Sequence, residues 1–194
     1  MHAEPPDATT RDRRLIDLVI QGEAEALDTW YRREHPHVFR VALGFLARWE
    51  EAEDLSQDAM LHLLDHLDAW DQKRPFRAWR NTVVANLCRD RLRRIAARGK
   101  AEKGAGAQPP QQRLPTPVDH ADQGEIRSIL IEALGELTDR EREVFVLRDL
   151  EGCPASEAAV ALDIGESTVR SLLSLARRRL RKLLGPRLAG QVEG

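Results

Sequence analysis

Apolar residues recur along most of this chain at intervals of three and four positions, the spacing of one face of an α-helix. A short helix over residues 15–20 is predicted to end near Gly22, and a longer one over residues 23–48 is predicted to bend or break at Pro36. A third helix is expected over residues 50–70. Its apolar residues repeat every four positions and form one stripe: Leu55, Ala59, Leu63 and Leu67.

The fourth predicted helix, residues 76–98, divides into three faces at about 100° per residue. Two apolar stripes lie side by side, Phe76, Trp79, Val83, Leu87 and Val84, Cys88, Leu92, Ile95. The third face mixes small residues with arginines: Ala78, Asn81, Thr82, Ala85, Arg89, Arg93 and Ala96. Such a face lets a nucleic-acid backbone approach closely while guanidinium groups reach its phosphates. A helix with an ordinary basic surface shows the same pattern, and this alternative stays open.

A segment of different composition follows the fourth helix. Residues 99–124 contain four Gly, four Pro and four Gln, with Leu114 and Val118 as the sizeable apolar side chains, too few for the segment to fold by itself. We therefore predict a flexible linker between two small helical modules, residues 1–98 and residues 125–194. At roughly 3.3 Å per residue, the extended linker would reach about 86 Å.

The second module ends in a pattern typical of a helix-turn-helix. Thr138 and Glu141 form a capping-box pattern, and the helix that they open is expected to end near Gly152. A short helix over residues 154–162, a tight turn and a longer helix over residues 167–184 follow. In a helix-turn-helix the second helix enters the major groove of DNA. Two helices that merely pack together give a similar pattern, so this alternative also stays open.

The longer helix of this pair has two distinct faces. Its apolar residues share one side: Val169, Leu172, Leu173, Ala176, Leu180, Leu183 and Leu184. Its polar and basic residues point away from that side: Ser167, Arg170, Ser171, Ser174, Arg178, Arg181 and Lys182. The N-terminal members of the polar face would reach base edges, and the distal basic ones would lie against phosphates.

Composition supports an all-α fold. Aromatic residues make up 5% of the 194 residues and charged residues 32%, whereas strands draw on aromatic and β-branched side chains. With 42% hydrophobic residues the chain can bury a core, yet no apolar run approaches the roughly 20 residues that span a bilayer. The polar N-terminus also lacks a signal-peptide core. We therefore expect a cytoplasmic protein without membrane insertion.

The net charge of −2 conceals three segregated blocks of charge. Residues 50–71 hold eight acidic residues and no Lys or Arg, residues 77–98 hold seven Arg and one acid, and residues 170–187 are basic without an acid. Any one block is typical of a solvated helix face. Together, the basic blocks favour phosphate backbones as partners, and the acidic helix favours a basic protein.

Enzymatic and metal chemistry is weakly indicated. Cys88 and Cys153 form no CxxC pair, so each is interpreted as a small buried hydrophobe. His62 and His66 stand four residues apart and could hold a metal, but surface histidines account for them equally simply. The sequence has no phosphate loop, dinucleotide fingerprint or catalytic triad motif, so no cofactor, metal or enzyme activity is expected.

Several motifs in order resemble one family. They are AEDLSQD at 52–58, FRAW at 76–79 with NL at 86–87 and DRLRR at 90–94, LTDRERE at 137–143 and VLRDLEG at 146–152. In this order they resemble regions 2 and 4 of the extracytoplasmic-function (ECF) sigma factors of bacterial RNA polymerase. The resemblance implies a promoter-specificity subunit that binds core RNA polymerase, recognises minus-10 and minus-35 promoter elements and promotes promoter melting. It also implies an anti-sigma factor as a partner.

Site residues follow from the resemblance, position by position. The contact with the β′ clamp helices of the polymerase would involve Asp54, Gln57, Asp58 and Leu61. Minus-10 DNA would lie near Lys73, Arg74, Trp79, Asn81, Thr82, Arg89 and Arg93, although core packing is the preferred interpretation of Trp79. Minus-35 DNA would lie near Ser167, Thr168, Arg170, Ser171, Ser174 and Arg178, in the module that also touches the β flap. The two promoter elements lie roughly 70 Å apart, within reach of the linker.

The sequence departs from the family in the helix-turn-helix. Asp163 stands in the turn where relatives usually have glycine, and Leu172 and Leu175 stand where arginine is frequent. Leu172 borders the apolar stripe, whereas Leu175 projects towards the polar face and suits a thymine methyl group or a protein. The minus-35 preference therefore stays open. Two competing functions are a helix-turn-helix regulator that acts without polymerase and a helical adaptor that binds only proteins.

Overall fold

The computed structural model describes residues 8–104 and 121–189, and for residues 8–9, 99–104, 121–127 and 186–189 only the backbone. The N-terminal module consists of α1 (Ala8–Ile20), α2 (Ala24–Leu46), α3 (Trp49–Asp65), the 3₁₀ turn η1 (Leu67–Ala69) and α4 (Phe76–Gly104). The C-terminal module consists of α5 (Ala121–Gly135), α6 (Asp139–Phe145), the π turn η2 (Val146–Leu150), α7 (Ala155–Leu162) and α8 (Glu166–Ala189). The described residues contain no strand, which confirms the all-α prediction.

Some helix boundaries differ from those predicted. The helix α2 continues through Pro36, so the chain is not interrupted there. The helix α4 continues to Gly104 and α5 begins at Ala121, so helices extend into both ends of the predicted linker over 99–124. The remainder of that linker, 105–120, lies outside the described residues. The capping box is confirmed, since the Glu141 N–H donates to the Thr138 hydroxyl and the Thr138 N–H donates to the Glu141 carboxylate.

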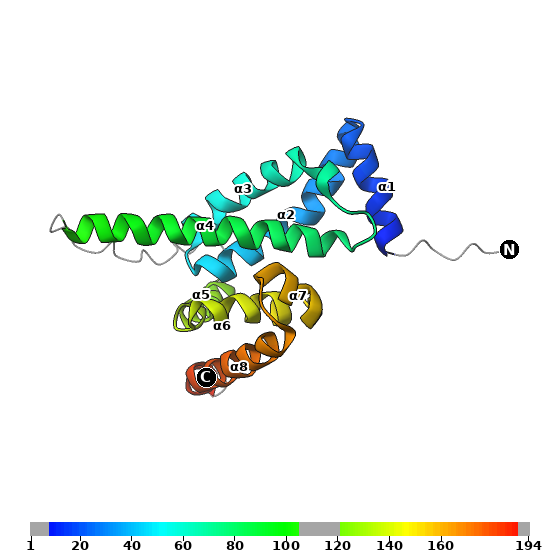
Figure 1. Ribbon diagram of the computed structural model, residues 1–194. Coiled ribbons are helices and arrows are strands. Elements are labelled where there is room, and N and C mark those ends of the chain that lie inside the picture. The colour runs from blue at the N-terminus through cyan, green and yellow to red at the C-terminus, as the bar shows by residue number, and fades with distance from the viewer. Residues whose placement is uncertain (1–7, 105–120, 190–194) are drawn as a thin grey trace.

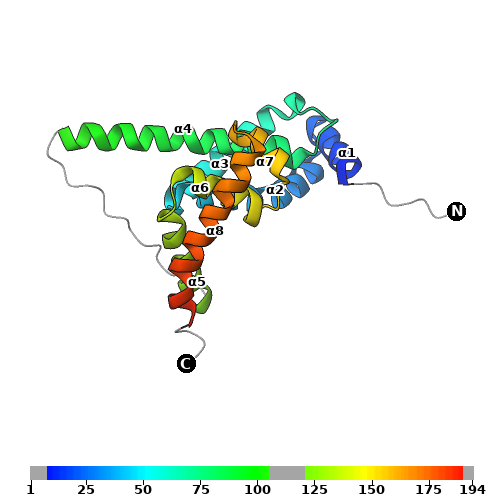
Figure 2. The ribbon, with the colours of Figure 1, turned by 60° about the horizontal axis from the view of Figure 1, so that its bottom comes forward.

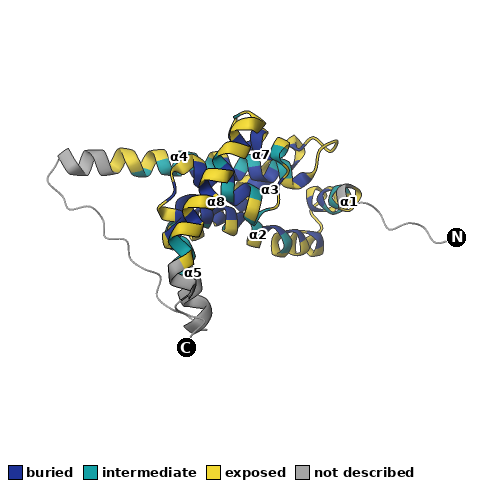
Figure 3. Ribbon diagram, turned by 90° about the horizontal axis from the view of Figure 1, so that it is seen from below, coloured by how far each residue is buried: buried dark blue, intermediate teal, exposed yellow. Residues whose placement is uncertain are grey.

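The two modules pack against each other and share one hydrophobic core. Trp30, Phe45 and Leu63 of the N-terminal module belong to the same buried cluster as Val146 and Leu162 of the C-terminal module. The helix α7 packs on α4, while α6 and η2 pack on α2 (Figure 1). Buried segments of both modules meet at this seam in the view of Figure 3. A second, smaller cluster joins α5 to α8 through Leu134, Leu137, Ala176 and Leu180.

Small side chains allow the helices of the seam to approach closely. Gly44 of α2 lies against η2, and a Cβ atom built there would stand 2.5 Å from a Val146 methyl carbon. On α4, Ala85 is fully buried, and Ala158 and Ala159 of α7 are buried as well. The small face of α4 that was predicted to admit a nucleic-acid backbone therefore admits α7 in this structure.

Asp163 ends α7 in the left-handed conformation, with φ of 52°. This conformation is strained for most L-residues, whereas glycine adopts it without steric strain. We expect Asp163→Gly to raise the free energy of unfolding by up to about 1 kcal/mol in urea denaturation, and Asp163→Ala to lower it. Equal stability of the two variants would contradict the assignment of strain to this turn.

Candidate polymerase and DNA interfaces

The acidic helix α3 presents its predicted polymerase contact to solvent. Asp54, Gln57 and Asp58 are exposed, and the Leu61 side chain is 63% exposed, which is unusual for a leucine. Behind this surface, Arg91 of α4 donates to Glu51 at 2.8 Å and to Asp58 at 3.4 Å and so links α3 to α4. The opposite side of α3 is buried in the core, as the stripe of Leu55, Ala59 and Leu63 predicted.

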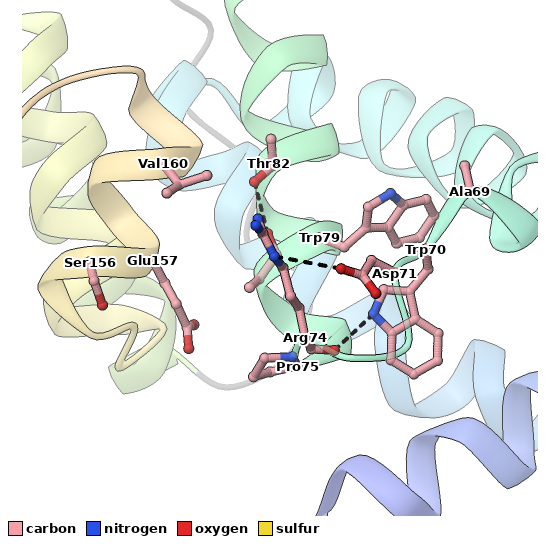
Figure 4. Close-up of a pocket in the computed structure, with 11 residues that line it drawn as sticks. Ala69, Trp70, Asp71, Arg74, Pro75, Trp79, Thr82, Ser156, Glu157 and Val160 are labelled. Atoms are coloured by element: carbon pink, nitrogen blue, oxygen red, sulfur yellow. Dashed lines mark hydrogen bonds and ion pairs between the residues drawn. The ribbon is translucent and has the colours of Figure 1, made fainter.

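The loop before α4 forms one wall of a cavity of about 570 Å³. Figure 4 shows Trp70, Arg74 and Trp79 on this side and Glu157 and Val160 of α7 on the other. The Trp70 indole N–H donates to the Arg74 carbonyl at 3.0 Å, which holds the loop in place. The cavity thus combines aromatic surface and a guanidinium group, the side chains that hold an unstacked base.

The remaining predicted minus-10 residues near the cavity lie in different settings. Lys73 is exposed in the loop, where its N–H donates to the Asp71 carboxylate. Thr82 is half-buried beside the cavity, and its hydroxyl donates to the Ala78 carbonyl. Trp79 is half-buried, packs against the core and also lines the cavity, so the two interpretations given for it are not exclusive.

Further along α4, the predicted minus-10 residues are covered by the C-terminal module. The Asn81 side chain is buried, and its amide donates to the Cys153 sulfur at 2.9 Å. Arg89 is half-buried and donates to both carboxylate oxygens of Glu143, at 3.1 and 3.0 Å. Arg93 lies beyond the seam, is exposed and pairs with Asp90 on its own helix. In this conformation, Asn81 and Arg89 do not face solvent as a DNA-contacting surface requires.

An ionic cluster in the seam was missed by the sequence analysis. The Glu151 carboxylate, 1% exposed, accepts hydrogen bonds from Arg40 at 2.6 Å, from the His37 ring at 3.0 Å and from Arg80 at 3.1 Å. Arg80 is itself buried and also donates to Glu34 at 2.7 Å. Nothing in the periodicity marks these residues as buried, because a charged residue on a helix is normally solvated.

The cluster favours the ionised form of Glu151. Burial by itself would raise the pKa of Glu151, but hydrogen bonds from His37 and Arg40 and the charge of Arg80 outweigh it and lower the pKa. Cys88 and Cys153 are both buried, as predicted, and burial raises the pKa of each thiol.

The lowered pKa of Glu151 predicts a dependence of stability on pH. Its stabilising effect is complete above the ordinary carboxyl value of 4.5 and is lost as the pH falls through the lowered pKa. Below that ordinary value, the free energy of unfolding of the wild type should therefore fall more steeply than that of Glu151→Gln. Denaturant titrations between about pH 7 and pH 3 measure both curves. Parallel curves would assign the acid sensitivity to other carboxylates.

The predicted recognition helix α8 has the two faces expected of it. Its polar residues Ser167, Thr168, Arg170, Ser171, Ser174 and Arg178 are all exposed. Val169, Leu173, Ala176 and Leu180 are buried. Leu172 packs partly against the core, whereas Leu175 is 36% exposed, as the helical wheel indicated. The predicted minus-35 surface of α8 is therefore exposed while the modules are packed together.

The described part of the chain was also compared with the requirements of a metal site and of a membrane-spanning helix. Within residues 8–104 and 121–189, no group of three or more His, Cys, Asp or Glu residues is placed to hold a metal ion. The His62 and His66 rings stack on each other at 4.2 Å instead. Among the described helices, none is both long and apolar enough to cross a membrane.

Comparisons with known proteins match both modules. The family Sigma-70 region 2 matches residues 30–98, and the family Sigma-70, region 4 matches residues 127–180. The ECF RNA polymerase sigma factor SigM of Mycobacterium tuberculosis (strain ATCC 25618 / H37Rv) is 30% identical over 174 residues, which cover 90% of this chain and 85% of SigM. SigL of the same strain is 30% identical over 163 residues, which cover 84% of this chain and 90% of SigL.

Solved structures show the same arrangement of helices. CnrH in complex with the cytosolic domain of CnrY matches with a TM-score of 0.66 and 26% identity, over 93% of this chain and 99% of that one. The sigma factor RpoE of Bartonella quintana, in complex with the anti-sigma factor NepR, has a TM-score of 0.71 at 21% identity over 81% of this chain and 96% of RpoE, which supports the fold. The chain therefore belongs to the ECF RNA polymerase sigma factors, with sigma region 2 in its N-terminal module and region 4 in its C-terminal module.

Proposed function

We propose that this sigma factor binds core RNA polymerase through the exposed surface of α3 formed by Asp54, Gln57, Asp58 and Leu61. One observation carries this proposal: a leucine that is 63% exposed among carboxylates. An apolar side chain ringed by charges is typical of a protein contact, in which the charges steer a basic partner and the apolar group is buried on binding. The β′ clamp helices of the polymerase are the proposed partner.

Promoter recognition is divided between the two modules in this proposal. Arg74, Trp79 and Thr82 line a cavity, and Lys73 is exposed in the adjoining loop. The aromatic surface and the guanidinium group of this cavity suit a base of the minus-10 element once the strands separate. Arg93 extends this surface along α4, and Asn81 and Arg89 join it only where the C-terminal module does not cover them. The exposed polar face of α8 reads the minus-35 element, and the same module touches the β flap.

The remaining parts of the proposal follow from the family. RNA synthesis is left to the polymerase, so the chain itself carries no catalytic step, and it acts in the cytoplasm together with the polymerase. An anti-sigma factor is proposed as a further partner, because RpoE was solved in complex with the anti-sigma factor NepR and CnrH in complex with the cytosolic domain of CnrY.

Co-elution of the purified chain with sigma-free core polymerase tests the polymerase contact. The double variant Asp54→Lys/Asp58→Lys is expected to weaken binding about 100-fold or more, because two attractive charges become repulsive against a basic surface. Size-exclusion chromatography over a range of core concentrations measures the change.

A matched variant separates the specific contact from the change in net charge. Glu25→Lys/Asp28→Lys alters the charge equally at two exposed positions of α2 and is expected to co-elute like the wild type. Circular dichroism shows whether each variant is folded. Failure of the folded wild type to co-elute would refute the proposed function and leave a regulator that acts without polymerase.

A further inference from the structure

The helix α1 is fastened to the loop that precedes α4. The Arg13 guanidinium donates two hydrogen bonds to the Gln72 carbonyl, from Nε at 2.9 Å and from a terminal nitrogen at 2.5 Å. One turn further along α1, the Asp17 carboxylate accepts a hydrogen bond from the Gln72 side-chain amide at 3.4 Å. Both the backbone and the side chain of one loop residue are therefore held by a helix that lies 55 to 59 positions earlier in the sequence.

The helix α1 is itself firmly attached to the rest of the N-terminal module. Ile16 and Val19 are buried in the shared core, and Asp12 pairs with Arg33 of α2 at 3.0 Å. Arg13 is half-buried, whereas the loop that it contacts is exposed. A contact from a packed helix restricts such a loop, which would otherwise sample many conformations.

The loop held in this way carries two cations that the proposed function assigns to minus-10 DNA, Lys73 and Arg74. Within the loop, the Trp70 indole N–H donates to the Arg74 carbonyl and the Lys73 N–H donates to the Asp71 carboxylate, so the loop forms one hydrogen-bonded unit. The Gln72 side chain is engaged with α1, while Lys73 and Arg74 are exposed. The position of the two cations therefore depends on the attachment of this unit to α1.

We infer that Arg13 and Asp17 are positioning residues for minus-10 recognition, which hold the loop where Lys73 and Arg74 meet the DNA. This inference rests on the proposed function of the loop. Donors that are fixed before binding hold a ligand more tightly than the same donors on a mobile loop, because the entropy of ordering them is not lost on binding. Arg13 itself does not line the cavity, so its effect passes through Gln72.

Holoenzyme reconstituted from the full chain and core polymerase provides the test, with core polymerase alone as the background. The probe is a fluorescent single-stranded DNA of about 12 nucleotides and random sequence, and fluorescence anisotropy measures its binding. Arg13→Ala is expected to weaken binding about tenfold, since two charge-assisted hydrogen bonds to the loop are lost. Arg13→Lys keeps one donor and should weaken binding less than about threefold. Arg14→Ala removes the same charge from an exposed position of α1 and should bind within about twofold of the wild type.

A double-mutant cycle separates positioning from direct contact. In a Lys73→Ala/Arg74→Ala background, Arg13→Ala should weaken DNA binding less than about twofold further, because the cations that it positions are gone. A further tenfold loss in that background would mean that Arg13 touches the DNA itself. Binding of Arg13→Ala equal to that of the wild type would mean that the contact only stabilises the fold. Either result would overturn the inference.

Hydrogen exchange of the free chain follows the loop without any DNA. In Arg13→Ala, the amides of residues 70–74 should exchange at least about fivefold faster than in the wild type, while those of α3 stay unchanged. Unchanged exchange in the loop would show that α1 does not restrict it and would also overturn the inference. DNA binding of Lys73→Ala/Arg74→Ala equal to that of the wild type would instead refute the proposed function of the loop, and faster exchange in Arg13→Ala would still stand.

Discussion

Arg80→Ala is expected to lower the free energy of unfolding by about 3–5 kcal/mol, as measured by urea denaturation. Arg80 joins two carboxylates that have almost no exposure of their own, Glu34 at 5% and Glu151 at 1%. Among the described residues, removing the guanidinium leaves Glu34 with the neighbouring Arg33 and leaves Glu151 with His37 and Arg40. Two buried charges are then poorly compensated, and the desolvation cost of each is no longer offset.

Two further variants show whether burial is the cause. Arg32→Ala breaks an exposed pair with Asp28 and is expected to change stability by less than about 1 kcal/mol. Arg80→Lys keeps the charge but cannot reproduce the planar set of donors that reaches both Glu34 and Glu151, so its loss of stability should be intermediate. A loss for Arg80→Ala as small as that for Arg32→Ala would mean that water reaches the cluster.

Gly44→Ala is expected to separate the two modules while it strengthens α2 itself. Alanine is favoured over glycine inside a helix by about 1 kcal/mol. The new methyl group, however, would stand 2.5 and 3.0 Å from the two methyl carbons of Val146, and both residues are buried. The expected result is an increase in the radius of gyration by small-angle X-ray scattering with unchanged helix content.

A second substitution, at Val146, should restore the packing of the modules in the Gly44→Ala variant. Val146→Ala removes both methyl carbons, so the double variant Gly44→Ala/Val146→Ala should regain the compact radius that Gly44→Ala loses. Val146→Ala alone should stay compact and lose about 1–3 kcal/mol of stability, as expected for a shortened core side chain. A compact Gly44→Ala chain would show that α2 and η2 shift apart without undocking.

The buried face of most helices could be predicted from the sequence, because the spacing of apolar residues along a helix shows which side packs into the core. The faces of α8 and the stripe of α3 agree with the structure, and Thr138 with Glu141 marks the start of α6 correctly. The family motifs likewise predicted the positions of the exposed residues of α3. Each of these signals is local, within one or two turns of helix.

The packing of the modules could not be predicted, because it depends on pairs distant in the chain. A face of small residues and arginines fits a DNA backbone and fits the alanine-rich α7 equally well, so Ala85 and Arg89 gave no sign of which covers them. Glu151 and Arg80 are 71 residues apart, and each by itself resembles a solvated charge. Their burial follows only when both sides of the seam are known.

The long helix α4 also determines how far region 4 could move away from region 2. Figure 2 shows α4 extending well past the other helices, and it remains helical to Gly104. Residues 105–120 can span at most about 53 Å at full extension, and the last turns of α4 add about 18 Å of stiff length. Region 4 is thus tethered close to its own docking surface, at an effective concentration in the millimolar range. A separate molecule that competes for that surface must overcome this local concentration.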